Sequence, residues 1–151
     1  IVRELAPLAG KLQLIAICGK NTSLKAKLEA MHSPVKMFVE GFTSQVPAYM
    51  HMSDFLIGKP GPGSINEALA MKLPVIVERN AWTLPQERYN ADWVVENGVG
   101  LVVNDFSKEV ATAVRQLLEP AHFERYRAKA AAIENRAVFE IPQILAKILE
   151  P

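Results

Sequence analysis

A segment rich in glycine and proline near the middle of the chain carries the residues best suited to bind phosphate. It consists of Lys59-Pro60-Gly61-Pro62-Gly63-Ser64-Ile65-Asn66-Glu67. Glycines let backbone amides approach a ligand closely, and a helix that follows offers unpaired N–H groups and the positive end of its dipole. The segment therefore suits a diphosphate. A structural alternative is equally supported by these residues alone, because Pro-Gly pairs form turns and Ser64 with Glu67 matches a capping box.

A second polar segment, Pro85-Gln86-Glu87-Arg88-Tyr89-Asn90, follows a predicted strand and opens a predicted helix. The hydrogen-bonding side chains of Gln86, Glu87 and Asn90 at such a junction suit a ligand with many hydroxyl groups. Taken alone, the segment is better explained as the solvated first turn of a helix, where Glu87 is favoured by the helix dipole.

Other kinds of site are poorly supported. The glycine segment lacks the Gly-Lys-Ser/Thr of a P-loop and the third glycine of the dinucleotide fingerprint. The three histidines lack metal-ligand spacing, and no Asp-x-Asp pair offers two carboxylates to a metal-bound sugar nucleotide. No Ser, His and Asp stand in a nucleophile-elbow context. We therefore expect neither a metal nor a cofactor, and we expect Cys18 to be a buried strand residue.

The composition is that of a single globular domain. Half of the 151 residues are hydrophobic and the net charge is +1, which gives no electrostatic signature of nucleic-acid binding. No apolar run reaches the ~18 residues of a membrane span, and no signal peptide opens the chain. A group of basic residues is predicted to form a solvated helix face, with contact to anionic lipid as the alternative; it comprises Arg125, Arg127, Lys129 and Arg136.

Short apolar runs alternate with helical patterns along the chain. Strands are predicted at residues 12–18, 35–39, 55–57, 73–77 and 99–103. Helices are predicted at residues 1–9, from Ser23 to Met31, at 48–52, 64–71, 107–118, 122–133 and 138–149, with Ser23 and Ser107 as caps. Strands joined by helices of this length require crossovers, which predicts a Rossmann-like parallel sheet with helices on both faces. Ligands then bind beyond the carboxyl ends of the strands, at one shared rim.

The first element bears on domain organisation. The chain begins inside the helical pattern of residues 1–9. We therefore expect residues 1–151 to form one domain, shortened at its N-terminus.

Taken together, these loops resemble the C-terminal, donor-binding domain of GT-B glycosyltransferases. Within that group the chain is most similar to monogalactosyldiacylglycerol synthases and to the peptidoglycan N-acetylglucosaminyltransferase. The similarity runs essentially end to end, and the proline-glycine loop with its glutamate, followed by Gln86-Glu87, is its most specific part. The other matching segments are Ile17-Cys18-Gly19-Lys20-Asn21, Gly41-Phe42-Thr43, Leu73-Pro74-Val75-Ile76, Asn90, Val94-Val95-Glu96-Asn97-Gly98-Val99-Gly100 and Ala137-Val138-Phe139.

The resemblance implies a role for each loop in binding a UDP-sugar. The diphosphate would lie against Gly61, Gly63 and Ser64, and Glu67 would accept hydrogen bonds from the ribose hydroxyls. Phe42 would pack on the uracil while the backbone of Thr43 reads its edge. The sugar hydroxyls would be held by Gln86, Glu87 and Asn90. Gly19 and Asn21 fall at the same rim without a defined contact.

The resemblance also implies a reaction for the intact enzyme. A hexosyl group would pass from the UDP-sugar to a diacylglycerol-like lipid acceptor, with inversion and without a metal. The general base and the acceptor site would lie on an amino-terminal domain absent here, so these residues alone should bind the donor weakly and catalyse nothing. The intact enzyme would be cytoplasmic and peripheral at a membrane surface, or in a plastid if the source is a plant. The last predicted helix, residues 138–149, would cross to the other domain, which predicts an exposed apolar side.

Two departures from the family limit these expectations. A strand and a glycine-rich loop that precede the first helix in family members are absent, and residues 79–84 differ and are one residue longer. Two alternatives therefore stay open. One is an epimerase or hydrolase of UDP-sugars with the GT-B shape, and the other is a non-catalytic Rossmann-like domain that binds a nucleotide or a protein partner.

Overall fold

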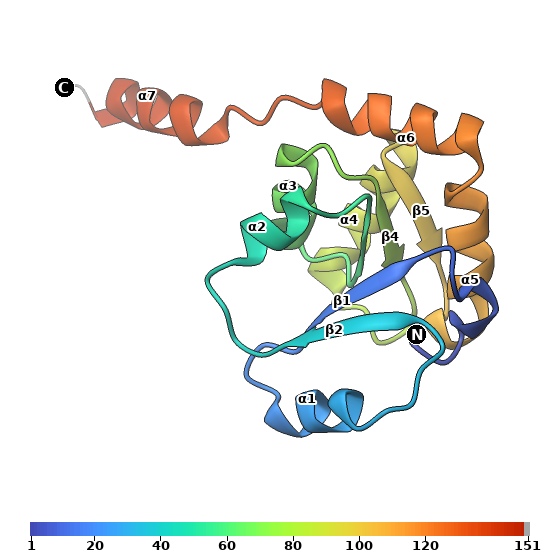
Figure 1. Cartoon of the computed structure of the whole chain (residues 1–151). Helices are drawn as coiled ribbons and strands as arrows, with labels where there is room; N and C mark the ends of the chain where they lie inside the picture. Colours follow the sequence, from blue (N-terminus) through green and yellow to red (C-terminus); the bar gives the residue numbers. More distant parts are fainter. Residues whose placement is uncertain (150–151) are drawn as a thin grey trace.

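The computed structural model describes residues 1–149 as alternating strands and helices (Figure 1). The strands are β1 (Gln13–Ile17), β2 (Lys36–Glu40), β3 (Leu56–Gly58), β4 (Val75–Glu78) and β5 (Gly100–Val103). The α-helices are α1 (Thr22–Glu29), α2 (Val46–His51), α3 (Pro62–Ala70), α4 (Pro85–Glu96), α5 (Phe106–Leu117), α6 (Pro120–Ala132) and α7 (Ala137–Leu149). A short 3-10 helix, η1 (Ala6–Leu8), precedes them.

All strand pairs are parallel, as the alternation of strands and helices predicted. They form two sheets rather than one: β1 pairs with β2, and β3, β4 and β5 pair in that order. Within residues 1–149, no ladder joins β1 to β3. The division could not be foreseen, because apolar runs identify strands without saying which strands are neighbours.

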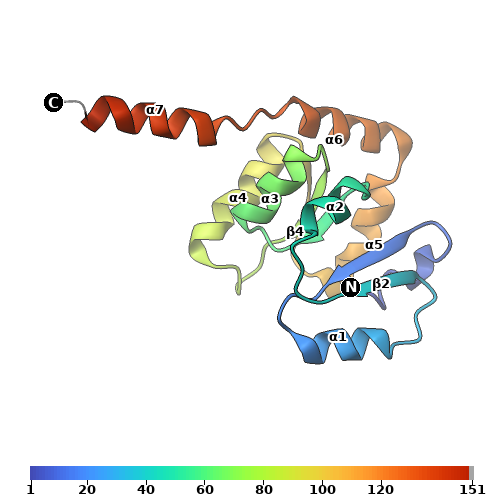
Figure 2. The ribbon, with the colours of Figure 1, turned by 60° about the vertical axis from the view of Figure 1, so that its left-hand side comes forward.

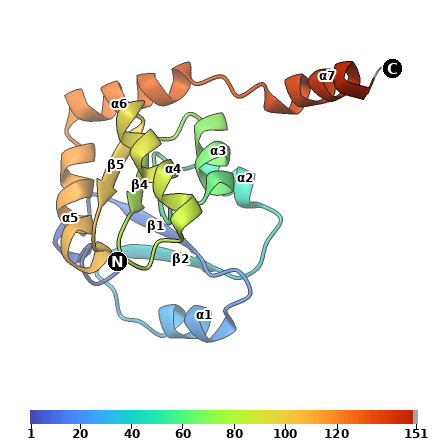
Figure 3. The same ribbon diagram turned by 180° about the vertical axis from the view of Figure 1, so that it is seen from behind.

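Helices cover both faces of the three-stranded sheet. Side chains alternate across a strand, so Ile76 of β4 packs in one apolar cluster with residues of α5, whereas Val75 and Val77 pack in the other with residues of α3 and α4. All three side chains are fully buried. Figure 3 shows α3 and α4 side by side on their face of the sheet. This arrangement confirms the predicted α/β class.

The amino-terminal third is less buried than predicted. Residues 1–9 form turns and η1 instead of an α-helix, because Pro7 lacks a backbone N–H and disfavours the continuation of a helix. Leu5 and Leu8 are nevertheless buried. Strand β1 is not covered on both faces, since Ile17 is 41% exposed, and Cys18 is half-buried rather than buried.

Two helices begin at residues other than the predicted caps. Helix α1 is capped by Asn21, and α5 is capped by Asp105. In α1, the Asn21 side-chain oxygen accepts a backbone N–H and the Ser23 hydroxyl. In α5, the Asp105 carboxylate accepts a backbone N–H and the Ser107 hydroxyl. Each cap thus lies two residues before the predicted one. Asx side chains are as good N-caps as serine, so a nearby pair of candidates leaves the helix start ambiguous in the sequence.

Helix α7 projects away from the rest of the domain in all three views (Figures 1, 2 and 3). None of its residues is buried. Its exposed apolar side chains are Val138, Phe139, Ile141, Ile144, Leu145, Ile148 and Leu149. The predicted exposure of an apolar side of this helix is therefore confirmed. No helix within residues 1–149 has the length and apolar character needed to span a bilayer.

Candidate functional site

The glycine-proline segment leads from β3 into α3, and α3 begins earlier than predicted. Its N-cap is Gly61 and its first residue is Pro62, because the fixed φ of proline suits the first turn and its missing N–H is not needed there. The first bond of the helix runs from the Ile65 N–H to the Gly61 carbonyl at 3.1 Å. The Ser64 hydroxyl donates to the same carbonyl, also at 3.1 Å. Ser64 therefore lies inside the helix, so the predicted helix start at Ser64 is wrong and the alternative of a capping box between Ser64 and Glu67 is excluded.

This geometry leaves backbone donors free at the helix N-terminus. No side chain caps α3, and the N–H groups of Gly63 and Ser64 donate to no acceptor within residues 1–149. A Cβ placed on Gly63 would have no atom within 4 Å apart from its chain neighbours and the backbone of α3, so the space beside this glycine is open. Two free amides, open space and the positive end of a nine-residue helix form a site that suits an anionic group.

Glu67 lies four residues after Gly63, on the same face of α3. Its side chain is exposed and forms no hydrogen bond or ion pair with any described residue. Residues at this spacing are roughly 5–6 Å apart between Cβ atoms, which is close enough for one ligand to contact both. The structure thus places the carboxylate of Glu67, which has no hydrogen-bond partner among the described residues, one helical turn beyond the free amides of Gly63 and Ser64.

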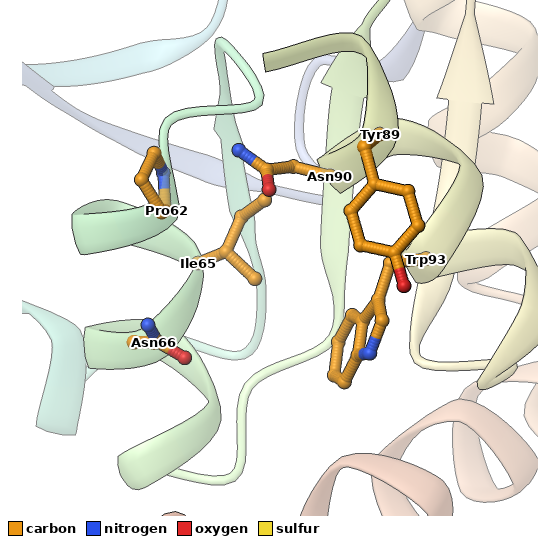
Figure 4. A pocket seen from close by; sticks show the side chains of 6 residues that line it. All are labelled: Pro62, Ile65, Asn66, Tyr89, Asn90 and Trp93. Carbon is orange, nitrogen blue, oxygen red and sulfur yellow. The ribbon is translucent and has the colours of Figure 1, made fainter. Parts of the chain in front are cut away.

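The N-terminus of α4 meets the same loop. Pro85 is its first residue, Gln86 is exposed, and the half-buried Glu87 directs its carboxylate toward α3. A Cβ on Gly61 would lie 4.0 Å from Glu87 Oε1. One turn further, the Asn90 amide donates to the Pro60 carbonyl at 2.8 Å and so fixes the loop before α3. Figure 4 shows Asn90 reaching from α4 toward α3. The side-chain nitrogen of Asn90 thus donates to the loop, and its side-chain carbonyl oxygen accepts from no described donor.

The groove drawn in Figure 4 lies beside this site, between α3 and α4. It has a volume of about 210 Å³. Of the predicted binding residues it contains only Asn90; the others that line it are Pro62, Ile65, Asn66, Tyr89 and Trp93. Helical periodicity places Asn66 about 100° around α3 from Glu67. The groove is therefore distinct from the face that carries Gly63 and Glu67.

The loops after β1 and β2 lie side by side. A Cβ on Gly41 would be 3.8 Å from the Gly19 carbonyl oxygen, and Lys20 Nζ lies 5.5 Å from the centre of the Phe42 ring. The Phe42 ring is 74% exposed, which leaves a face free to stack on a planar ligand. The Thr43 hydroxyl accepts the Gln45 N–H at 3.0 Å and stabilises the turn.

Asn21 contributes less to this rim than its position suggested. Its side-chain oxygen accepts the Leu24 N–H and the Ser23 hydroxyl, both at 2.9 Å. Only its amide nitrogen is left for a ligand. Gly19 has φ +56°, so it serves the turn after β1.

The sequence analysis did not identify Glu40, which positions the Phe42 loop. Its carboxylate accepts the Gly41 N–H at 2.7 Å and the Tyr49 hydroxyl of α2 at 3.0 Å, and Lys25 Nζ lies 3.8 Å away. The bond from Gly41, then that from Tyr49 and the charge of Lys25, lower the pKa of Glu40. The hydrogen bond between the Tyr49 hydroxyl and Glu40 raises the pKa of Tyr49. No sequence motif predicts these contacts, because they depend on how β2 and α2 pack against each other.

Trp82 is a second residue that the sequence analysis missed. Its side chain is 92% exposed in the loop between β4 and α4, close in sequence to Gln86 and Glu87. The loop is held by an ion pair between Arg79 and Asp92 at 2.6 Å and by a bond from Arg88 to the Thr83 carbonyl at 3.3 Å. The feature of the sequence that could have pointed to Trp82 is a large aromatic residue in a loop that follows a predicted strand.

We expect the Phe42 loop to loosen in acid because its anchor titrates there. A carboxyl group whose pKa is lowered by folding stabilises the folded form at pH values above its unfolded pKa of about 4.3. This contribution is lost as the pH falls through the lower, folded value. The amide resonance of Gly41, followed by NMR from pH 7 to 3, should therefore shift with a midpoint below the ordinary range of glutamate.

Glu40→Gln is the control for this titration. Glutamine can still accept the Gly41 N–H but has no proton to gain, so the shift of the Gly41 resonance should disappear. A midpoint at or above the ordinary glutamate range in the wild type would contradict the assignment.

Parallel strands, helices on both faces and two helix N-termini that meet beyond β3 and β4 define a Rossmann-like domain. Among solved structures, the chain resembles the glycotransferase of kitacinnamycin with a TM-score of 0.68 and 21% identity, over 99% of this chain and 38% of that one. The chain belongs to the glycosyltransferase family 28 C-terminal domain family, whose model matches residues 1–143. The predicted fold and family resemblance are confirmed.

Two plant proteins are similar in sequence. The probable monogalactosyldiacylglycerol synthase 3 of Oryza sativa is 38% identical over 132 residues, which cover 85% of this chain and 25% of that protein. Monogalactosyldiacylglycerol synthase 2 of Arabidopsis thaliana is 39% identical over 141 residues, which cover 91% of this chain and 30% of that protein. Both are described as chloroplastic. The chain thus spans between a quarter and a third of the length of these relatives.

Proposed function

We propose that this chain is the donor-binding domain of a hexosyltransferase that uses a UDP-sugar and glycosylates a diacylglycerol-like lipid. The observation that carries the proposal is the face of α3 on which the free amides of Gly63 and Ser64 stand one turn from the unoccupied carboxylate of Glu67. Membership of the glycosyltransferase family and similarity to galactolipid synthases support the donor and the acceptor class.

In this proposal the domain stabilises the leaving group. The acceptor hydroxyl oxygen attacks the anomeric carbon, the bond from that carbon to the diphosphate breaks, and negative charge develops on the departing UDP. The amides of Gly63 and Ser64 and the dipole of α3 are already oriented toward such charge, so they stabilise it without having to reorganise during the reaction. The proton of the hydroxyl passes to a general base, which we place outside residues 1–151.

The remaining loops hold the rest of the donor. Phe42 stacks on the uracil, the backbone of Thr43 reads its edge, and Glu67 accepts the ribose hydroxyls. Gln86 and Glu87 bind the sugar hydroxyls. Asn90 acts mainly on the loop, through its bond to the Pro60 carbonyl, and offers its free carbonyl oxygen to the sugar. Gly19 and Asn21 complete the rim without a direct role in specificity.

The donor is bound without a metal in this proposal, because a helix N-terminus and backbone amides supply the positive potential. The intact enzyme acts at a membrane surface, where its lipid acceptor lies. A plastid location is supported by the chloroplastic relatives.

Calorimetry in EDTA tests the donor assignment on this chain. UDP should bind, and ADP and NAD should bind more weakly, because the proposed contact of the Thr43 backbone with the edge of the base is specific for uracil. Binding that disappears on chelation, or a preference for adenine nucleotides, would count against the proposal.

The intact protein then separates the proposed reaction from the alternatives. Incubated with a UDP-sugar and diacylglycerol, a transferase should release UDP in proportion to the glycolipid it forms. An epimerase or hydrolase would convert the donor equally well without the lipid, and a non-catalytic domain would leave the donor unchanged.

A further inference from the structure

A second cavity lies at the edge of the three-stranded sheet, beside β5 and away from the donor site. It has a volume of about 360 Å³ and lies between α6 and the outer edge of β5. Gly98 and Gly100, which help to line it, stand at the amino end of β5, whereas the donor residues follow the carboxyl ends of β3 and β4. A volume above roughly 300 Å³ is in the range of small-molecule sites. The cavity is therefore large enough to hold a ligand of its own.

Two cations line this cavity from one helix. Arg125 and Lys129 of α6 are four residues apart and so lie on the same face. Like charges at this spacing disfavour a helix. Neither side chain has a carboxylate within 4 Å among residues 1–149, so the repulsion is not relieved by an ion pair there. Arg127 points to another side of α6, where it lies over the Phe123 ring at 5.9 Å.

The edge of β5 adds hydrogen-bond donors to the wall of the cavity. Among the described strands β5 pairs only with β4, and the carbonyls of Val99 and Val103 accept N–H groups from that side. Because residues of a strand alternate in direction, Gly100 and Val102 turn their N–H groups outward, and both residues line the cavity. The exposed side chain of Val95 provides apolar surface, whereas the Tyr126 ring is buried and carries the Arg125 guanidinium over it, 4.9 Å from its centre.

We propose that this cavity binds a phosphate ester that carries an apolar group. Arg125 and Lys129 contact the phosphate, the outward N–H groups of β5 donate to its oxygens, and the side chain of Val95 covers the apolar part. The ester is either a soluble molecule or the headgroup of an anionic phospholipid. An acidic peptide is a poorer fit, because the four-residue β5 exposes the backbone groups of only two residues to a pairing strand.

Phenyl phosphate is the probe, because it joins one phosphate to one apolar ring. Titrated into the chain and followed by NMR, it should shift the amide resonances of Gly100 and Val102. Arg125→Gln with Lys129→Gln should weaken this binding by about tenfold or more, as expected for the loss of two charge-assisted contacts. Arg127→Gln removes one positive charge from another side of the same helix and should leave the affinity unchanged. An excess of UDP should not displace phenyl phosphate from Gly100 and Val102, which separates this site from the donor site.

Vesicles distinguish the two sources of the phosphate. Co-sedimentation with phosphatidylcholine vesicles that contain phosphatidylglycerol, lost in the double variant and absent with phosphatidylcholine alone, assigns the site to a lipid headgroup. Binding of phenyl phosphate without co-sedimentation assigns it to a soluble ester. The proposal is overturned if the Gly100 and Val102 resonances do not respond, or if the double variant binds phenyl phosphate as tightly as the wild type.

Discussion

Glu67→Ala should lower the affinity of this chain for UDP by about ten- to a hundredfold and leave its fold intact. Hydrogen bonds from the ribose hydroxyls to a carboxylate are each worth about 1.5–3 kcal/mol, and one to two such bonds give this loss. The side chain is exposed and forms no hydrogen bond or ion pair with a described residue, so its removal should change the free energy of unfolding by less than about 0.5 kcal/mol. Melting temperature and calorimetric affinity, measured on the same samples, provide both quantities.

Two comparisons make the Glu67 experiment specific. Glu67→Gln keeps the shape of the side chain and removes its charge, so it should weaken UDP binding without affecting the melting temperature. A 2′,3′-dideoxy nucleotide lacks the hydroxyls and should bind wild type and both variants almost equally. Equal losses for UDP and the dideoxy analogue would show that Glu67 acts through the fold and would refute the ribose contact.

The structure excludes the capping box that the sequence allowed for Ser64 and Glu67. A capping box needs its serine at the N-cap, and the Ser-x-x-Glu pattern allowed that placement. Pro62 decides otherwise, since proline is most stable in the first turn and moves the start of α3 two residues before Ser64. The proline was visible in the sequence, and giving it more weight than the serine would have placed the helix correctly.

The order and direction of the strands were predictable, and their pairing was not. Alternating apolar runs and helices require parallel strands, and the three strands of the central sheet are parallel. Whether β1 joins that sheet depends on contacts between segments far apart in the chain. The exposed Ile17 and the half-buried Cys18 follow from the same cause, because β1 has one strand partner among residues 1–149.

The loops of the candidate site could be proposed from the sequence, but the contacts that hold them could not. Gly63 and Glu67 share a face because they are four residues apart, which sequence spacing alone implies. In contrast, the bond from Asn90 to the Pro60 carbonyl and the bond from Tyr49 to Glu40 join separate elements. Such contacts depend on how helices pack on strands, so the supporting residues of the site became visible only in the structure.

Gly63→Ala should abolish most UDP binding while the protein remains at least as stable. A Cβ at this position meets no atom within 4 Å apart from its chain neighbours and the backbone of α3, and alanine inside a helix is favoured over glycine by roughly 0.5–1 kcal/mol. Nothing in the folded chain therefore requires glycine here. If the diphosphate lies against the Gly63 amide, the added methyl group occupies the space of its oxygens, and the affinity should fall by about tenfold or more, a loss of at least about 1.4 kcal/mol.

Asn66→Ala is the matched control, because it changes a neighbouring exposed residue of α3 on the side that faces the groove toward α4. It should raise helix propensity in the same way and leave UDP affinity unchanged. Melting temperature and calorimetric titration with UDP compare the two variants directly. If Gly63→Ala binds UDP as well as the wild type does, the diphosphate does not lie at the N-terminus of α3. If both variants lose affinity equally, the effect comes from a change in the helix rather than from the space beside Gly63.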